Sequence, residues 1–427
     1  MQKIVIEEPY RFVPPYRGRA WSSFFRYVLP QYLRLSHGIV EVNCRGLDRF
    51  RESVRQGKGV LLAPNHCRLS DPMTLGWLVR ETGIHLYTMA SWHLFKQDRL
   101  FDRLSASMMR RLGAFSILRE GTDRAALTTA IDILASAERP LVIFPEGVVS
   151  RSNDRLGPLM DGVTFIARMA AKKAAKEGKP GVVIHPVALR YVFLDNVETA
   201  VEPFLGDLEQ RLTWHAQSRR PLLNRLRAIG EALLSLKEIE ATGTVGSDSL
   251  HDRRRRLIER LLRPIEEEWT SAAADDSVVS RVKEIRIAIL PSLLDRQLSA
   301  VERERLRRQL DDAALAQQLH FHPEGYLGSQ SPPERFLETV ERLEEDLLGA
   351  IRVYGRFRVM FDVCEAIDVP SEREKRAGRG EPDPLLELIG ERLRRQLEES
   401  GREVAASRGQ AVVHDLVEQP EHAAAGT

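Results

Sequence analysis

The fold is decided by residues 59–72, GVLLAPNHCRLSDP. The stretch begins as a short apolar run bounded by glycine and proline, which predicts a buried strand. It ends in Asp71-Pro72, and an aspartate followed by proline is a helix-start signal. His66 and Asp71 therefore lie in the crossover between a strand and a helix, which is where open α/β sheets bind their ligands.

A curled loop would bring the side chains of His66 and Asp71 together. The carboxylate would then accept a hydrogen bond from one imidazole nitrogen and leave the other nitrogen free as a base. The alternative is that Asp71 only caps the helix and that His66 is an ordinary polar loop residue.

Further apolar strands follow, separated by segments with helical spacing. This alternation predicts an α/β fold with a mostly parallel central sheet flanked by helices. The expected strands are residues 84–89, 113–119, 141–144 and 181–189, and the expected helices are residues 73–80, 100–112, 122–137 and 162–176.

The composition changes near residue 205 and becomes rich in Arg, Glu, Leu and Gln. We expect a large helical insertion here, with residues 285–289 as a possible strand and the charge runs as solvated helix faces. A sequence typical of a β-strand appears again at residues 357–363. A single strand cannot stand alone, so we expect this one to join the first sheet. The competing division is a separate C-terminal helical domain with its own small sheet.

The resulting division of the chain has five parts. We expect a basic, aromatic membrane-interfacial segment at 1–38, an α/β domain at 39–204, a charged helical insertion at 205–354, a returning strand and helix at 355–400, and a flexible tail at 401–427.

The composition and charge of the chain argue against several classes of function. The chain has 427 residues and a formal net charge of +2, which is too balanced to indicate nucleic-acid binding. Cys44, Cys67 and Cys364 are far apart, so the sequence indicates neither a disulfide framework nor a metal site, and we expect no metal. No run reaches the roughly 18 to 20 apolar residues of a membrane span. We expect a cytoplasmic protein, soluble or on the membrane surface.

Residues 10–38 combine arginines and aromatic side chains with no acidic residue. Arginine attracts anionic headgroups, and Trp, Tyr and Phe settle at the interfacial depth, so the segment is suited to lie on a bilayer without crossing it. The alternative is a helix that packs its aromatic residues on the α/β domain.

Four blocks in order resemble the glycerolipid acyltransferase family that includes the 1-acylglycerol-3-phosphate acyltransferases. The blocks are Asn65-His66 with Asp71, residues 113–119 ending in Arg119, residues 144–147 (Phe-Pro-Glu-Gly), and the apolar strand around Pro186. The resemblance covers residues 60–189 and, less closely, 359–369.

The resemblance implies an O-acyltransferase that needs no cofactor. Its donor substrate would be acyl-CoA or acyl carrier protein, its acceptor a lysophospholipid, and its location the inner face of the cell membrane. His66 would be the general base and Asp71 its orienting partner, while Arg119 would bind the acceptor headgroup and Glu146 would fix Arg119 or a glycerol hydroxyl. The implied substrate-binding residues are Asn65, Gly113, Arg119, Pro145, Glu146, Gly147, Ser150 and Arg151.

The third block departs from the family pattern. Phosphate-binding members carry Thr-Arg where this chain has Val148-Val149. Arg151 or Arg155 would have to replace that cation if the acceptor is 1-acylglycerol-3-phosphate. The alternatives are acylation or transacylation of another lysophospholipid or hydroxyl lipid, and a catalytically idle lipid-binding scaffold.

Overall fold

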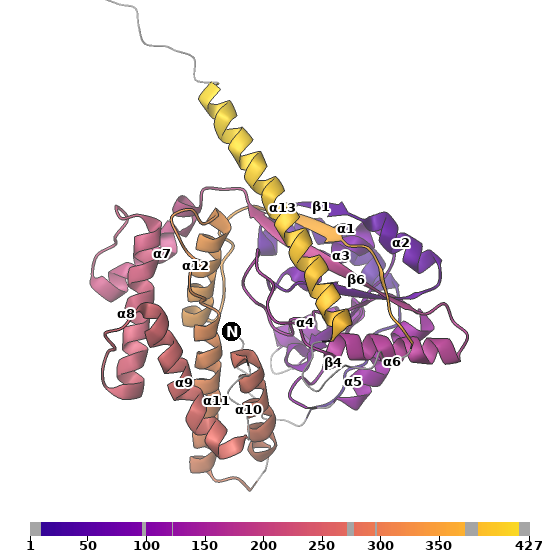
Figure 1. Ribbon diagram of the computed structural model, residues 1–427, viewed down its shortest axis with the longest axis horizontal. Helices are drawn as coiled ribbons and strands as arrows, with labels where there is room; N and C mark the ends of the chain where they lie inside the picture. The colour runs from indigo at the N-terminus through magenta and orange to yellow at the C-terminus, as the bar shows by residue number, and fades with distance from the viewer. Residues whose placement is uncertain are drawn as a thin grey trace, which may run out of the picture.

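The computed structural model describes residues 10–95, 100–121, 123–270, 277–294, 297–371 and 383–417. Its centre is a mixed sheet with the strand order β1-β7-β6-β2-β5-β3-β4, and β8 pairs with β6 (Figure 1). The strands are β1 (Ile39–Arg45), β2 (Gly59–Pro64), β3 (Tyr87–Ser91), β4 (Ala114–Ile117), β5 (Leu141–Val142), β6 (Val182–Phe193), β7 (Phe357–Val363) and β8 (Ile367–Asp368). Most neighbouring strands run parallel, while β7 and β8 are antiparallel to β6. The predicted fold class is confirmed.

Both faces of the sheet are covered, and the alternation of β2 shows how. Val60 and Leu62 point into one apolar cluster and Leu61 and Ala63 into another. The first cluster includes α1 (Ala20–His37), α2 (Leu47–Arg55) and α3 (Asp71–Thr82), and the second includes α5 (Arg124–Ser136), α6 (Gly162–Lys176) and α13 (Pro384–Val417). The short helix η1 (Trp92–Phe95) and α4 (Leu100–Arg111) connect β3 to β4. Because β2 is buried on both sides, it reads as a continuous apolar run.

Within the described residues, six helices lie between β6 and β7 in the chain. They are α7 (Val197–Thr213), α8 (Leu222–Thr242), α9 (Leu250–Trp269), α10 (Val278–Leu293), α11 (Ala300–His320) and α12 (Pro333–Leu348). Helices α9, α10 and α11 share a third apolar cluster, which Trp92 and Leu118 of the α/β layer join. We call residues 197–348 the helical region; Figure 1 shows it beside the sheet.

Strand β7 returns from the helical region to the sheet, where it lies between β1 and β6. It pairs parallel with β1 and antiparallel with β6, where Phe357 lies opposite Phe193. The strand predicted at residues 357–363 therefore docks on the first sheet, as expected.

Two expectations for the helical region and its edges are wrong. Residues 285–289 form part of α10, with Ile285 and Ile289 buried and Ile287 exposed. Isoleucines at every second position fit a strand, but two of them four residues apart also fit one helix face. The expected domain boundary at residues 204 and 205 falls inside α7, where Phe204 and Leu205 are buried in the first cluster.

The expected flexible tail is also wrong for residues 401–417. Helix α13 continues through them to Val417, and residues 418–427 lie outside the described part of the chain. Alanine, arginine and glutamate favour helix, so a stretch with few large apolar residues can still extend one. Arg408 anchors this extension through a hydrogen bond of 3.0 Å to Glu334 of α12.

Candidate active site

His66 and Asp71 are in contact at the carboxyl end of β2. The imidazole Nδ1 lies 2.9 Å from a carboxylate oxygen of Asp71, which is the first residue of α3. The loop between β2 and α3 curls so that the two side chains meet. Because Asp71 accepts the Nδ1 proton, the lone pair is on Nε2, the nitrogen that can take a proton from a substrate.

Three further donors hold the Asp71 carboxylate, which is fully buried. The amide N–H of Arg68 donates to the oxygen that also binds His66, at 2.9 Å. The hydroxyl of Tyr191 donates to the other oxygen at 2.6 Å, and the Cys67 thiol lies 3.9 Å from it. A carboxylate held by this many donors has one orientation, so it also fixes the imidazole.

Tyr191 is not among the site residues expected from the sequence. The residue lies in the apolar strand β6, where a tyrosine resembles any other buried aromatic residue. Burial, together with the negative charge of Asp71, raises the pKa of Tyr191 well above its usual value, so the hydroxyl remains a donor. Phe144 was quoted only as part of its block, yet its ring stacks on the His66 imidazole with centroids 4.0 Å apart.

The third block holds the main chain of His66. Glu146 accepts the His66 N–H at 2.6 Å and the Gly157 N–H at 2.9 Å. Ser150 donates to the His66 carbonyl twice, from its N–H at 2.8 Å and from its hydroxyl at 3.1 Å. Burial raises the pKa of Glu146 to about 7, although the two backbone N–H groups oppose this shift.

These contacts change the roles expected for Asn65, Glu146 and Ser150. Asn65 binds the main chain of Leu189 on β6, with its oxygen 2.7 Å from the N–H and its nitrogen 3.1 Å from the carbonyl. The polar atoms of all three residues therefore hold the loop between β2 and α3 against neighbouring segments. The expected partners of Glu146, Arg119 or a glycerol hydroxyl, are replaced by main-chain amides.

Gly113 does not lie near the candidate base. It precedes β4 and so stands at the opposite end of that strand from Arg119. Its φ is +106°, and a Cβ there would lie 2.3 Å from the Leu86 carbonyl oxygen. The glycine is required by the turn and by the close approach of β3, and the expectation that it binds substrate is wrong.

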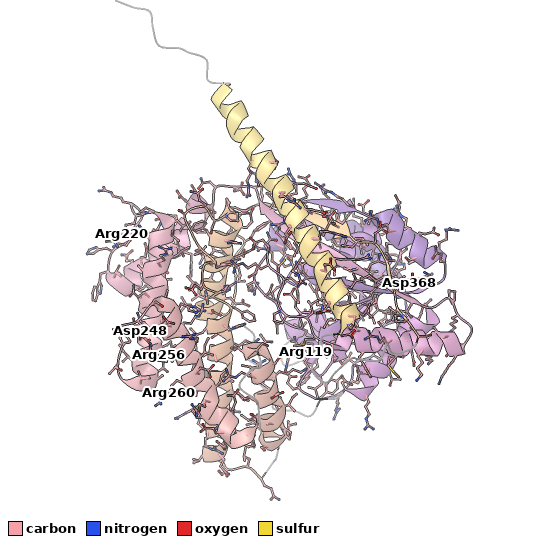
Figure 2. The ribbon with its side chains drawn as sticks, in the orientation of Figure 1. Arg119, Arg220, Asp248, Arg256, Arg260 and Asp368 are labelled. Carbon is pink, nitrogen blue, oxygen red and sulfur yellow. The ribbon has the colours of Figure 1, made fainter. Side chains whose placement is uncertain are left out.

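Arg119 lies where the second and third blocks meet. Its guanidinium donates to the carbonyl of Gly147, and the Pro145 carbonyl accepts the Met160 N–H at 2.8 Å. Figure 2 labels Arg119 at the side of the α/β layer that faces α10. The neighbouring Leu118 packs against the cluster of α9, α10 and α11. Arg119 is exposed, so its remaining donors can reach a ligand.

Arg151 is not free to replace the missing cation of the third block. It is buried, and its guanidinium forms an ion pair with Glu345 of α12. Helix α12 also pairs Glu341 with Arg68 of the loop between β2 and α3 at 2.8 Å. The helical region thus holds two arginines beside the candidate base. The guanidinium of Arg155 instead lies over the Tyr326 ring, 5.2 Å from its centroid.

A His–Asp pair with one free imidazole nitrogen at the carboxyl end of a strand is an arrangement for general base chemistry. Residues 41–190 match the family model described as Acyltransferase. The matched range begins in β1 and ends in β6, so it contains all four blocks. No curated protein matches the chain.

Proposed function

We propose that the protein is an O-acyltransferase that moves a fatty acyl group from an acyl thioester, carried by coenzyme A or acyl carrier protein, to a glycerolipid hydroxyl. The observation that carries this proposal is the 2.9 Å contact between His66 Nδ1 and Asp71 inside a domain that matches the Acyltransferase model. Nε2 of His66 takes the hydroxyl proton while the oxygen attacks the thioester carbonyl. The C–S bond breaks, and the departing thiolate takes the proton back from the imidazolium.

The transfer needs no acyl-enzyme, because a thioester is already activated. Cys67 is the nearest thiol, but it is fully buried, and this burial raises its pKa well above the usual value. A thiol is nucleophilic only as the thiolate, so Cys67 is a packing residue beside the pair. Asp71 orients His66 and stabilises the imidazolium.

The acceptor most consistent with the family resemblance is 1-acylglycerol-3-phosphate, with Arg119 on its phosphate. Arginine suits this role because its planar fork matches two phosphate oxygens. One observation favours the second candidate, another lysophospholipid or hydroxyl lipid. Val148-Val149 stand where phosphate-binding members carry Thr-Arg. Arg151, which could replace that arginine, is already paired with Glu345, so it is not available to a phosphate group. The assembled His66–Asp71 pair argues against an idle scaffold.

Helix α1 supports a peripheral position on a membrane. Its buried residues Leu29 and Leu33 face the sheet, while Phe24 is 61% exposed and Tyr27 is 67% exposed. Exposed aromatic residues beside Arg26 suit an anionic lipid surface. None of the described helices has both the length and the apolar character to cross a bilayer.

Purified protein incubated with labelled acyl-CoA or acyl carrier protein and a panel of lysolipids tests the proposal. We expect labelled product only when a hydroxyl acceptor is added, and the acceptor that gives product identifies the substrate. If no acceptor in the panel is acylated with either donor, the proposed activity is wrong.

Arg119→Ala tests the headgroup assignment separately. The variant should raise the KM for a phosphate-bearing acceptor about tenfold or more and leave the KM of the donor nearly unchanged, because one charge-assisted hydrogen bond contributes roughly 1.5 to 3 kcal/mol. Equal effects on donor and acceptor would contradict the assignment.

A further inference from the structure

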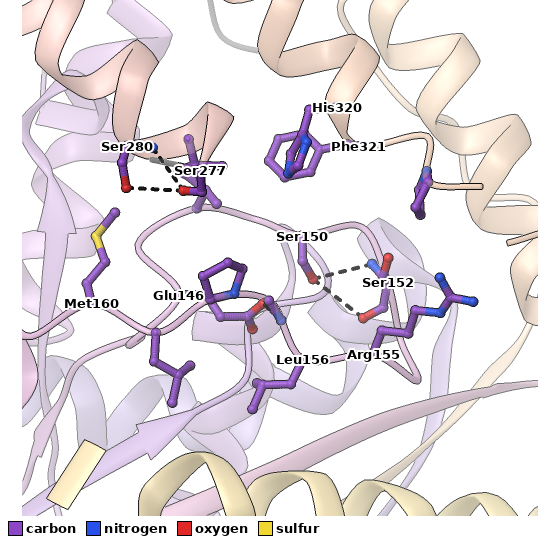
Figure 3. Close-up of a pocket in the computed structure, with 16 residues that line it drawn as sticks. Glu146, Ser150, Ser152, Arg155, Leu156, Met160, Ser277, Ser280, His320 and Phe321 are labelled. Atoms are coloured by element: carbon purple, nitrogen blue, oxygen red, sulfur yellow. Dashed lines mark hydrogen bonds between the residues drawn. The ribbon is translucent and has the colours of Figure 1, made fainter. Parts of the chain in front are cut away.

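A cavity of about 230 Å³ lies where the α/β layer meets the helical region. Residues of the loop between β5 and α6 line one side, among them Glu146, Val148 and Met160. The other side comes from the start of α10 and from residues 320–323, which connect α11 to α12. Figure 3 shows Ser277 and Ser280 on one wall and Leu156 and Met160 across from them.

Several polar groups of the lining are already paired within the protein. The hydroxyls of Ser277 and Ser280 lie 3.1 Å apart, and the Ser150 hydroxyl donates to the His66 carbonyl. Both carboxylate oxygens of Glu146 accept main-chain N–H groups. A hydrogen-bonding ligand would therefore gain little from these groups.

The remaining walls are largely apolar. They include Val148, Leu156, Leu159, Met160, Val279 and Phe321. Burial lowers the pKa of His320, and the positive charge of Arg254 lowers it further, so the imidazole in the lining is neutral near pH 7. Arg155 is the positively charged residue of the lining. Its guanidinium packs over the Tyr326 ring and lies at the edge of the lining in Figure 3.

The cavity adjoins the candidate base. Glu146 and Ser150, which line it, are both hydrogen bonded to the main chain of His66. Val148, which stands where phosphate-binding relatives carry threonine, contributes to the apolar wall. The departure from the family pattern therefore coincides with an apolar surface next to the catalytic loop.

We propose that this cavity binds the hydrocarbon chain of a substrate, and that α10 and residues 320–323 of the helical region set the chain length it accepts. The role of the bound chain in the reaction rests on the proposed function. The binding of a hydrocarbon chain is inferred from the apolar lining and does not depend on that function. Each buried methylene contributes about a fourfold gain in affinity. A bulky side chain that occupies the space of two methylenes should therefore weaken chain binding about tenfold or more.

Val279→Trp fills the cavity from α10, and Ile287→Trp is the matched control, because Ile287 lies on the same helix and is 38% exposed. Binding of cis-parinaric acid, measured by its fluorescence, should weaken about tenfold or more in Val279→Trp and remain unchanged in Ile287→Trp and in His66→Ala. Thermal unfolding monitors whether each variant folds. Ser280→Leu provides a smaller filling if Val279→Trp does not fold, since the N-cap hydroxyl of Ser277 remains.

Two substrate series identify the source of the chain. One series varies the acyl length of acyl-CoA with a fixed acceptor, and the other varies the acyl length of the acceptor with a fixed donor. The filled variant should shift the optimum to shorter chains in the series whose chain occupies the cavity. Unchanged probe binding and unchanged optima in both series would overturn the inference. If wild-type protein transfers no acyl group but Val279→Trp still abolishes probe binding, the cavity assignment holds and the proposed function fails.

Discussion

The α/β layer and helix α12 both contact the loop that carries His66, but they are held by different forces. In the layer, β2 is buried between two apolar clusters, one on each face. In α12, the buried residues include Glu338, Glu341, Arg342 and Glu344 alongside Leu337 and Val340. The layer gains stability from apolar area removed from water, whereas α12 depends on matched charges. The two regions should therefore respond to different substitutions.

The pairing of Arg68 with Glu341 shows what matched charges do here. Both side chains are nearly buried, and the Arg68 guanidinium also lies over the Phe357 ring, 4.4 Å from its centroid. A buried pair of this kind contributes little compared with an apolar pair of equal size, but the loss of one partner leaves an uncompensated charge. Helix α12 is thus a specific contact for the loop that carries His66 and Asp71.

Among substitutions of residues around His66, the largest effect on the rate is expected at the buried Asp71 carboxylate of the α/β layer. Asp71→Asn should lower kcat about a thousandfold, because asparagine has one acceptor oxygen where the carboxylate has two. Its NH2 group must therefore face either His66 and the Arg68 N–H or the Tyr191 hydroxyl, although all of these groups donate to Asp71. Tyr191→Phe should lower kcat about tenfold through the loss of one hydrogen bond to a charged group. Steady-state rates at saturating substrates test both. A tyrosine variant as damaging as the aspartate variant would contradict this order.

Glu341→Ala should destabilise the protein by about 3 kcal/mol, because Arg68 would be left buried and charged. The double variant Arg68→Met with Glu341→Leu should recover most of this loss. In the sheet, Leu62→Ala should cost roughly 2 to 5 kcal/mol, and no charge change elsewhere should restore it. Urea unfolding measures all three. If the double variant is as unstable as Glu341→Ala alone, α12 is not held by matched charges.

Glu146→Gln should alter the pH dependence of stability. The pKa of Glu146 is raised from 4.5 to about 7 in the folded protein, so its stabilising contribution is complete below pH 4.5 and is lost as pH rises through about 7. Glutamine does not titrate. The unfolding free energy of the variant relative to wild type should therefore rise by about 2 to 3 kcal/mol between pH 5 and pH 8.

The control for this experiment is Glu240→Gln, since Glu240 is exposed on α8. This exposed carboxyl gives the baseline for replacing a glutamate by glutamine over the same pH range. A difference for Glu146→Gln that changes no more with pH than this baseline would contradict the role of burial described for Glu146.

The smallest effect is expected at Asp383, the residue before α13. Burial alone would raise the pKa of Asp383, but hydrogen bonds from Arg168 and from the Leu385 N–H outweigh it and lower the pKa to about 2. The contribution is therefore present above pH 3.8 and is lost as pH falls through about 2. Asp383→Asn should cost about 1 to 2 kcal/mol at pH 7 and less at pH 3. A cost that is the same at both pH values would assign the effect to packing rather than to charge.

The sequence predicted the apolar layer well, because strand burial leaves a local pattern. The predicted bounds of α6 and β7 agree with the structure, and the Asp71-Pro72 signal marks the start of α3. Strand β1 was not predicted, although Ile39–Arg45 alternates apolar and polar residues between Gly38 and Gly46, a pattern typical of a half-buried strand. The patterns that predict strands and helices involve residues close together in the sequence, so they can be recognised without knowing which distant residues are in contact.

The parts that could not be predicted depend on pairs far apart in the chain. Glu341 and Arg68 are separated by 273 residues, and Glu345 and Arg151 by 194. Taken one at a time, such residues look like a solvated charged helix face, which is how the charge runs of the helical region were interpreted. In α9, Arg253 is in fact buried against Glu238 at 2.7 Å, while Arg255 is exposed.

We infer that His66 is the base that activates a hydroxyl acceptor. Initial rates of labelled acyl transfer for His66→Ala and Cys67→Ala, at saturating donor and acceptor, test this inference. We expect the rate to fall about a hundredfold to ten-thousandfold in His66→Ala and to stay near the wild-type rate in Cys67→Ala. A His66→Ala rate equal to wild type, or a Cys67→Ala rate of zero with an acyl group trapped on the wild-type enzyme, would contradict it.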